Sequence, residues 1–165
     1  MSAATMGNML FLLNDKCESA LAALVMPAAF AVEPEINVYP GKSSAERALP
    51  CVICGADGDG LEDPKGTGNF WMDCYVAIEH GAVPNEDGTS PDGPDPKVAD
   101  QALVSAVFGG LMVEDLAAQL SAAVADFTVF PMGVIFGAPE GGRNEDGVWI
   151  DRLPIRLYCC GRALG

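Results

Sequence analysis

The sequence predicts an α+β fold, in which a mainly antiparallel twisted sheet of four to five strands carries helices on one face. Strand-like alternation of apolar and polar residues stands on both sides of a helical middle. Half of the 165 residues are hydrophobic, which supplies a core, and 19 glycines and 12 prolines favour strands joined by turns over a helix bundle. A chain of this length suits one domain.

The first predicted element is a helix that begins at a capping box. Asp15 is followed three residues later by Glu18, the spacing at which two side chains can satisfy each other's backbone N–H groups. Pro27 should end or kink this helix. Residues 1–14 are expected to form a loose lead-in, and the single domain to span 15–165.

Strands are predicted from alternation, and the clearest has one apolar and one mixed face, as in a sheet covered on one side. Pro131 indicates a bulge or an edge position, and Pro131 and Pro154 together mark the last two strands as possible edges. The predicted strands are 36–39, 49–55, 69–80 (the clearest), 127–136 and 148–160. In the last of them one face is expected to carry Trp149, Leu153, Ile155, Leu157 and Cys159, and the other Arg152, Arg156 and Tyr158.

Two helices are predicted in the middle of the chain. Asp95 and Pro96 are typical of a helix start, Gly109-Gly110 should interrupt that helix, and a second helix is expected at about 113–124. The long acidic loops are expected at 56–68, 82–96 and 137–147.

The charge is strongly acidic, with 9 Lys and Arg against 23 Asp and Glu, a formal net charge of −14. This balance argues against wrapping nucleic acid, which needs clustered cations, and against an anionic membrane surface. No segment reaches the ~20 apolar residues of a membrane span. The apolar MLFLL near the start has no basic residues before it, so no signal peptide is expected and the six cysteines are expected to be free thiols.

Cys51 and Cys54 form a C-x-x-C-G pattern that resembles half of a zinc site. A structural zinc site needs four ligands, yet the sequence has no second C-x-x-C and one histidine, and Val52-Ile53 favour an extended chain. A calcium loop starting at Asp57 fails because position 61 is leucine. We therefore expect no metal and no cofactor, with Cys51 and Cys54 as the only metal candidates.

Catalytic motifs are missing from the sequence. It contains no nucleophile elbow and no H-E-x-x-H, and Glu79 and His80 would point to opposite faces of a strand. The chain is therefore predicted not to be an enzyme, and a small enzyme centred on His80 is the alternative.

Four stretches, VYPG at 38–41, LPCVICGA at 49–56, GTGNFWMDCYVAI at 66–78 and WIDRLPIRLYCCG at 149–161, occur in an order that resembles tail terminator, or tail-completion, proteins of long-tailed bacteriophages. The resemblance covers roughly residues 15–161. The positions that match as fold-forming residues are Leu49, Pro50, Gly68, Asn69, Leu157 and Tyr158.

This resemblance implies an assembly function. Such proteins form a ring, commonly a homohexamer, on the head-proximal end of the tail tube, where the ring stops tube growth and joins the head. The implied partners are copies of the chain itself, the tail tube protein and a head connector or neck protein. DNA passes through without specific binding, and the implied location is the tail–neck region of a virion assembled in the host cytoplasm.

Long polar segments and exposed cations are the candidate interface. The alternatives are another neck or head–tail joining protein, and a small cysteine-based metal-binding module. The candidate interface residues are Asp57, Asp59, Glu62, Asp63, Asn85, Glu86, Asp87, Arg152 and Arg156.

Overall fold

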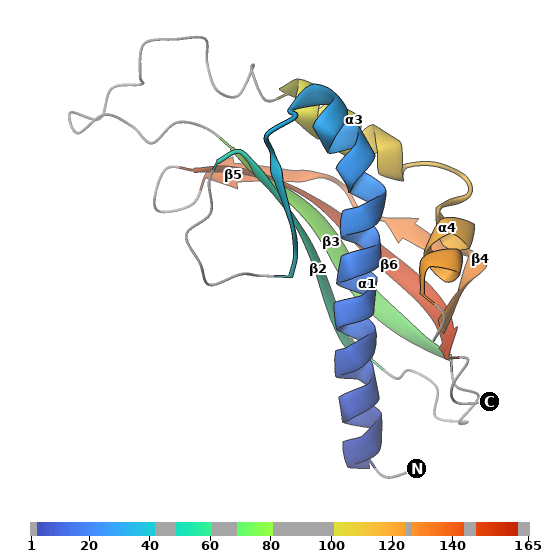
Figure 1. The fold of residues 1–165 in the computed structure, drawn as a ribbon. Helices are drawn as coiled ribbons and strands as arrows, with labels where there is room; N and C mark the ends of the chain where they lie inside the picture. Colours follow the sequence, from blue (N-terminus) through green and yellow to red (C-terminus); the bar gives the residue numbers. More distant parts are fainter. Residues whose placement is uncertain are drawn as a thin grey trace, which may run out of the picture.

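The computed structural model describes residues 3–41, 49–60, 69–80, 101–124, 127–143 and 148–161, which form three helices and six strands (Figure 1). In chain order the elements are α1 (Ala3–Val32), β1 (Asn37–Pro40), β2 (Cys51–Gly60), β3 (Asn69–His80), α3 (Gln101–Leu111), α4 (Leu116–Ala123), β4 (Phe127–Phe136), β5 (Glu140–Arg143) and β6 (Trp149–Gly161).

The strands form one mixed sheet in the order β1-β2-β3-β6-β4, and β5 pairs with β6 next to β4. Only the β1–β2 pair is parallel among the described strands; the others are antiparallel. The predicted α+β fold is confirmed. The sheet has six strands because β5 forms inside the segment 137–147, where the sequence EGGR lacks the alternation that announces a strand and takes its conformation from pairing with β6.

Helix α1 is longer than its capping pattern predicts. It begins at Ala3 and ends at Val32, so residues 3–14 are helical and do not form a loose lead-in. Asp15 therefore lies inside the helix, and the Glu18 carboxylate accepts a hydrogen bond from the backbone N–H of Ala56 on β2, at 3.0 Å. Pro27 does not end the helix, because the alanine-rich segment around it has a high helix propensity and packs on the sheet.

The core lies between the helices and one face of the sheet (Figure 1). Alternate residues of β3 and β6 supply its floor, and Cys17, Leu21 and Val25 of α1 lie on it with exposed fractions of 0–1%. The predicted apolar faces of both strands are thus confirmed. Their buried residues are Phe70, Met72, Cys74, Val76 and Ile78 of β3 and Leu153, Ile155, Leu157 and Cys159 of β6.

Helices α3 and α4 lie on the same face of the sheet as α1 (Figure 1). The prediction that Gly109-Gly110 interrupts α3 is wrong: the helix continues to Leu111. A Cβ atom at Gly110 would lie 3.3 Å from the Ala28 Cβ, so the glycine allows α3 to approach α1 closely. Within the described ranges no single helix is long and apolar enough to cross a membrane; α3 and α4 reach that length only together, bent by 81° at their break.

The two prolines of the last strands have different positions. Pro131 lies in the edge strand β4 at a bulge, where the register with β6 shifts between Val129 and Val134, as predicted. The edge prediction from Pro154 is wrong, because β6 lies between β3 and β4. The Pro154 carbonyl accepts a hydrogen bond from the Gly137 N–H at 2.9 Å, on the side of β6 that faces β4 and β5. In an antiparallel strand the N–H of a residue points to the same side as its carbonyl, so the N–H that proline lacks would also point there. That position lies between the end of β4 and the start of β5, so no strand hydrogen bond is lost.

Leu21→Ala tests the contact between α1 and the sheet. Leu21 is fully buried, so its truncation should lower the free energy of unfolding by about 2–5 kcal/mol through lost transfer energy and a residual cavity. Urea unfolding followed by circular dichroism measures this change. Ser19→Ala, at an exposed position of the same helix, is the matched control and should stay within about 0.5 kcal/mol of the wild type. Equal effects of the two substitutions would contradict the packing described here.

Candidate functional site

The outer face of the sheet, which no described helix covers, is built from direct cross-strand pairs between β3 and β6. Trp71 pairs with Tyr158 and Asp73 with Arg156, and further along Tyr75 pairs with Pro154. Side chains opposite each other on one face of an antiparallel pair touch and stabilise the sheet. This register places the aromatic and charged residues of two distant segments in one continuous surface.

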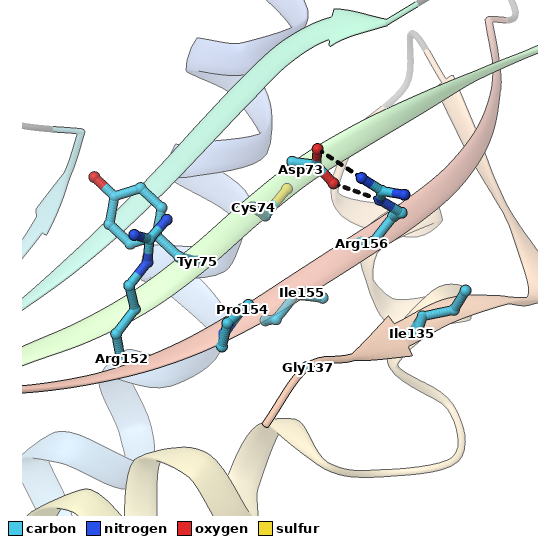
Figure 2. A pocket seen from close by; sticks show the side chains of 9 residues that line it. All are labelled: Asp73, Cys74, Tyr75, Ile135, Gly137, Arg152, Pro154, Ile155 and Arg156. Carbon is cyan, nitrogen blue, oxygen red and sulfur yellow. Dashed lines mark hydrogen bonds and ion pairs between the residues drawn. The ribbon is translucent and has the colours of Figure 1, made fainter. Parts of the chain in front are cut away.

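Two arginines of β6 are held on this face by different contacts (Figure 2). Arg156 donates two hydrogen bonds to the Asp73 carboxylate, from Nε at 2.6 Å and from Nη2 at 3.1 Å. The Arg152 guanidinium carbon lies 4.3 Å from the centre of the Tyr75 ring, a cation–π contact. Arg156 and Asp73 remain 54% and 52% exposed, so their ion pair contributes only about 0–1 kcal/mol to stability and stays available to a partner.

A hollow of about 490 Å³ separates the two arginines. β3 contributes Asp73 and Tyr75 to its wall, and the end of β4 contributes Ile135. A volume of this order is typical of sites that enclose a small group of atoms. We call this surface the arginine hollow and define it by Asp73, Tyr75, Ile135, Arg152 and Arg156.

An aromatic row continues the same face toward β4. The Trp71 and Tyr158 rings have centroids 4.6 Å apart, and Phe130 stacks on Tyr158 at 4.9 Å. Arg156 also lies 5.8 Å from the Trp71 ring centre. Tryptophan, tyrosine and arginine are the residue types that carry most binding energy at protein interfaces, so this face has the composition of a docking surface.

Glycines on neighbouring strands make room for these side chains. A Cβ atom at Gly55 would lie 2.2 Å from the Tyr75 ring, which shows that Tyr75 lies flat across β2 at that position. In the same way a Cβ at Gly137 would lie 3.0 Å from Pro154, and one at Gly133 would lie 2.8 Å from the Tyr158 carbonyl oxygen. Tyr75 in turn positions Arg152, so Gly55 acts on the arginine hollow through one intervening residue.

The predicted interface residues fall into three groups. Arg152 and Arg156 share the outer face, as predicted, and the hollow joins them. Asp57 and Asp59 lie in β2, which extends to Gly60, so the prediction of a loop at 56–68 is wrong for residues 56–60, and residues 61–68 lie outside the described ranges. The residues outside the described ranges are Glu62, Asp63, Asn85, Glu86 and Asp87, together with the 82–96 loop and the Asp95 cap.

Three of the six fold-forming positions of the resemblance lie in strands β3 and β6. Asn69 opens β3, and Leu157 is fully buried in the core. Tyr158 lies on the outer face within the aromatic row. Leu49 packs against a small apolar cluster on the outer side of β2 and is joined to Pro50 by a cis peptide bond, while Gly68 is outside the described residues.

The metal hypothesis fails on the geometry of β2. Cys51 belongs to the outer apolar cluster and Cys54 to the main core, so the two thiols lie on opposite faces of the sheet. No group of three or more metal-ligating side chains occurs in the described part of the chain. All six cysteines are free thiols, and the Sγ atoms of Cys17 and Cys74 lie 3.5 Å apart in the core.

His80 is part of the interior and is not an exposed base. It is 1% exposed, and its Nε2 lies 2.6 Å from Oδ2 of Asp151 on β6. Asp151 is a partner that sequence reasoning missed; the register of β3 with β6 would have been needed to find it. A histidine this deeply buried offers no surface to a substrate, which removes the basis for an enzyme centred on it.

Comparison with known proteins gives likenesses among solved structures. No family model matches the sequence, and no curated protein matches it. Among solved structures the chain is similar to one chain of the virion of a native gene transfer agent particle, with 17% identity, a TM-score of 0.44, and coverage of 87% of this chain and 96% of that chain. At this identity and TM-score the match bears on neither function nor assembly.

Gly55→Ala tests how the hollow is positioned. The added methyl group would occupy the place of the Tyr75 ring, so the ring should swing away and Arg152 should lose its cation–π contact. We expect a changed near-ultraviolet circular dichroism spectrum and a loss of about 1–3 kcal/mol in stability. Gly142→Ala is the control, because a Cβ there meets nothing within 4 Å. An unchanged spectrum in Gly55→Ala would contradict the close approach of Tyr75.

Thiol labelling tests the burial of the cysteines. Burial raises the pKa of the Cys54 thiol to about 12, and burial also raises the pKa of the Cys159 thiol. The pKa of the Cys74 thiol is raised well above its usual value by a hydrogen bond with Cys17 and by burial. The thiolate is the reactive form, so of the six cysteines only the half-buried Cys160 should react quickly with an aromatic disulfide reagent at pH 8. Cys160→Ser should remove the fast phase. Fast labelling of Cys54 in the native protein would show that β2 opens readily.

Proposed function

We propose that this chain is a tail terminator of a long-tailed bacteriophage, a non-enzymatic virion protein that caps the head-proximal end of the tail tube. The observation that carries the proposal is spatial. The four stretches that resemble this family correspond to β1, β2, β3 and β6, and these four strands are neighbours in the sheet. A resemblance spread along the sequence is therefore gathered into one continuous structural unit.

The described surface supports an assembly role. A ring subunit must offer two different surfaces, one to each neighbour, and the contact between them must close. The chain offers an outer sheet face rich in aromatic residues and arginine, a short edge strand β1, and the bulged edge strand β4 on which Met132 is 94% exposed. Large apolar side chains exposed next to charged ones are typical of protein contact sites.

The charge of the chain fits a conduit for DNA. With a formal net charge of −14, the subunit has little to hold a phosphate backbone, and an acidic ring interior would repel DNA and let it slide. In this proposal the ring is a homohexamer of the virion tail–neck region, assembled in the host cytoplasm. Its further partners are the tail tube protein and a head connector or neck protein. A basic lumen in a solved ring would contradict the proposal that DNA slides through an acidic ring interior.

Tube capping tests the proposed function. Purified protein is mixed with growing tail tubes of the cognate phage, and electron microscopy records tube length and the occupancy of tube ends. We expect rings at one end of each tube and an arrest of growth there, and light scattering should give a mass that is a whole multiple of 17.2 kDa.

Bovine serum albumin at the same concentration is the control for non-specific arrest. Tubes that grow to the same length with bare ends would contradict a terminator. Binding to head connectors in place of tubes would favour the neck-protein alternative.

A further inference from the structure

Positive charge on the described surface is concentrated at the arginine hollow. Among the side chains that the structure describes, the lysines and arginines are Lys16, Arg152 and Arg156, and the last two line the same hollow. Asp73 pairs with Arg156. Glu140 lies opposite Arg152 in the register of β5 with β6 but forms no ion pair with it, so among the described side chains Arg152 keeps its hydrogen-bond donors for a partner. An acidic group on a partner is therefore the complement that electrostatics favours.

The turn between α3 and α4 carries that complement. Met112 is 46% exposed and Val113 is 37% exposed, and the next two residues, Glu114 and Asp115, are exposed acids. These four residues stand where the two helices bend by 81° relative to each other. The Asp115 carboxylate accepts a hydrogen bond from Gln119 Nε2 at 2.8 Å, which fixes one of the two acids on the helix. We call Met112–Asp115 the helix corner.

The two surfaces match in chemistry and lie on different sides of the sheet. The acids of the corner suit the arginines of the hollow, and Met112 and Val113 suit Ile135, which is 51% exposed at the wall of the hollow. The corner belongs to the helical layer and the hollow to the opposite face of the sheet. The helix corner of a subunit therefore cannot reach the arginine hollow of the same subunit. The helix corner of a second copy can reach it through a head-to-tail contact.

We propose that the arginine hollow of one subunit binds the helix corner of a second copy of this chain, with Glu114 as the carboxylate that Arg152 receives. This inference rests on the proposed function, because a head-to-tail contact of this kind is what repeats around a closed ring. Arginine receives a carboxylate through two parallel N–H donors, and Tyr75 holds the Arg152 guanidinium by a π contact that leaves hydrogen-bond donors for that role.

A charge swap tests the contact. Arg152→Glu reverses the charge in the arginine hollow, and Glu114→Arg reverses the charge at the helix corner. Each substitution alone brings like charges together and should weaken self-association at least about tenfold. The double variant restores opposite charges across the contact and should associate within a few-fold of the wild type. A mixture of the two single variants should also form mixed assemblies. Light scattering over a range of concentrations, at low and high salt, measures the association.

Matched controls separate position from charge. Lys16→Glu and Asp15→Arg change the same charges on exposed residues of α1 and should leave association unchanged. Arg152→Gln removes the charge without reversing it and should give an intermediate loss. Rescue in the double variant and in the mixture requires folded protein, so misfolding of a single variant cannot imitate the expected pattern.

The same variants are scored for tube capping, which separates this inference from the proposed function. Assemblies that ignore both substitutions but still cap tubes overturn the contact and leave the terminator role. A wild-type protein that remains a monomer also overturns the contact, and loss of tube binding in Arg152→Glu with intact assemblies shows that the hollow binds the tube instead. Assemblies that follow the charge swap but never engage tubes support the contact and overturn the terminator role.

Discussion

The twelve-residue antiparallel register of β3 with β6 is the constraint on which the rest of the structure depends. From the Asn69–Cys160 pair to the His80–Trp149 pair the two strands match without a break. In each strand, alternate residues point to opposite faces: one set forms the buried surface on which the helices pack, and the other set forms the outer face with its aromatic and charged residues. A shift by one residue would move the arginines into the core and the core leucines to the surface, so burial of one face fixes the composition of the other.

That register also explains why the outer face is ordered although much of it is exposed. Tyr75 lies across Gly55, Pro154 packs beside Gly137, and Tyr158 has Gly133 next to its backbone. The absence of side chains on one strand lets larger ones lie flat on the next, where they support the two guanidinium groups. The candidate site is thus mainly a product of strand packing, to which Gly137 in the connection between β4 and β5 also contributes.

The sequence is informative where one residue pattern dominates. The alternation of apolar and polar residues predicted a strand at 69–80, which are the observed bounds of β3, and placed Arg152 and Arg156 on one face of β6. It succeeds because every second residue of a half-buried strand points into the core. Pro131 announced the bulge in β4 because proline cannot donate to the ladder.

What the sequence could not supply comes from contacts between distant segments. The full extent of α1 depends on packing that outweighs the signals at Asp15 and Pro27. Strand β5 exists only because β6 is beside it, and Asp151 meets His80 only through the register of two strands far apart in the chain. The hollow itself has no motif, since Gly55, Tyr75 and Arg152 come from three strands.

The position of β6 in the sheet has a consequence for synthesis of the chain. It is interior in the sheet, yet of the described strands it is the last to emerge from the ribosome, and it pairs with β3 through contacts such as Phe70 with Cys159. At roughly 5–20 residues per second, β3 would wait on the order of 4–18 s for its partner. During that interval one edge of β3 is unpaired and half of the core floor is missing. Newly made chains should therefore depend on chaperones that shield strand edges, and crowded synthesis would raise the risk that β3 of one chain pairs with β6 of another.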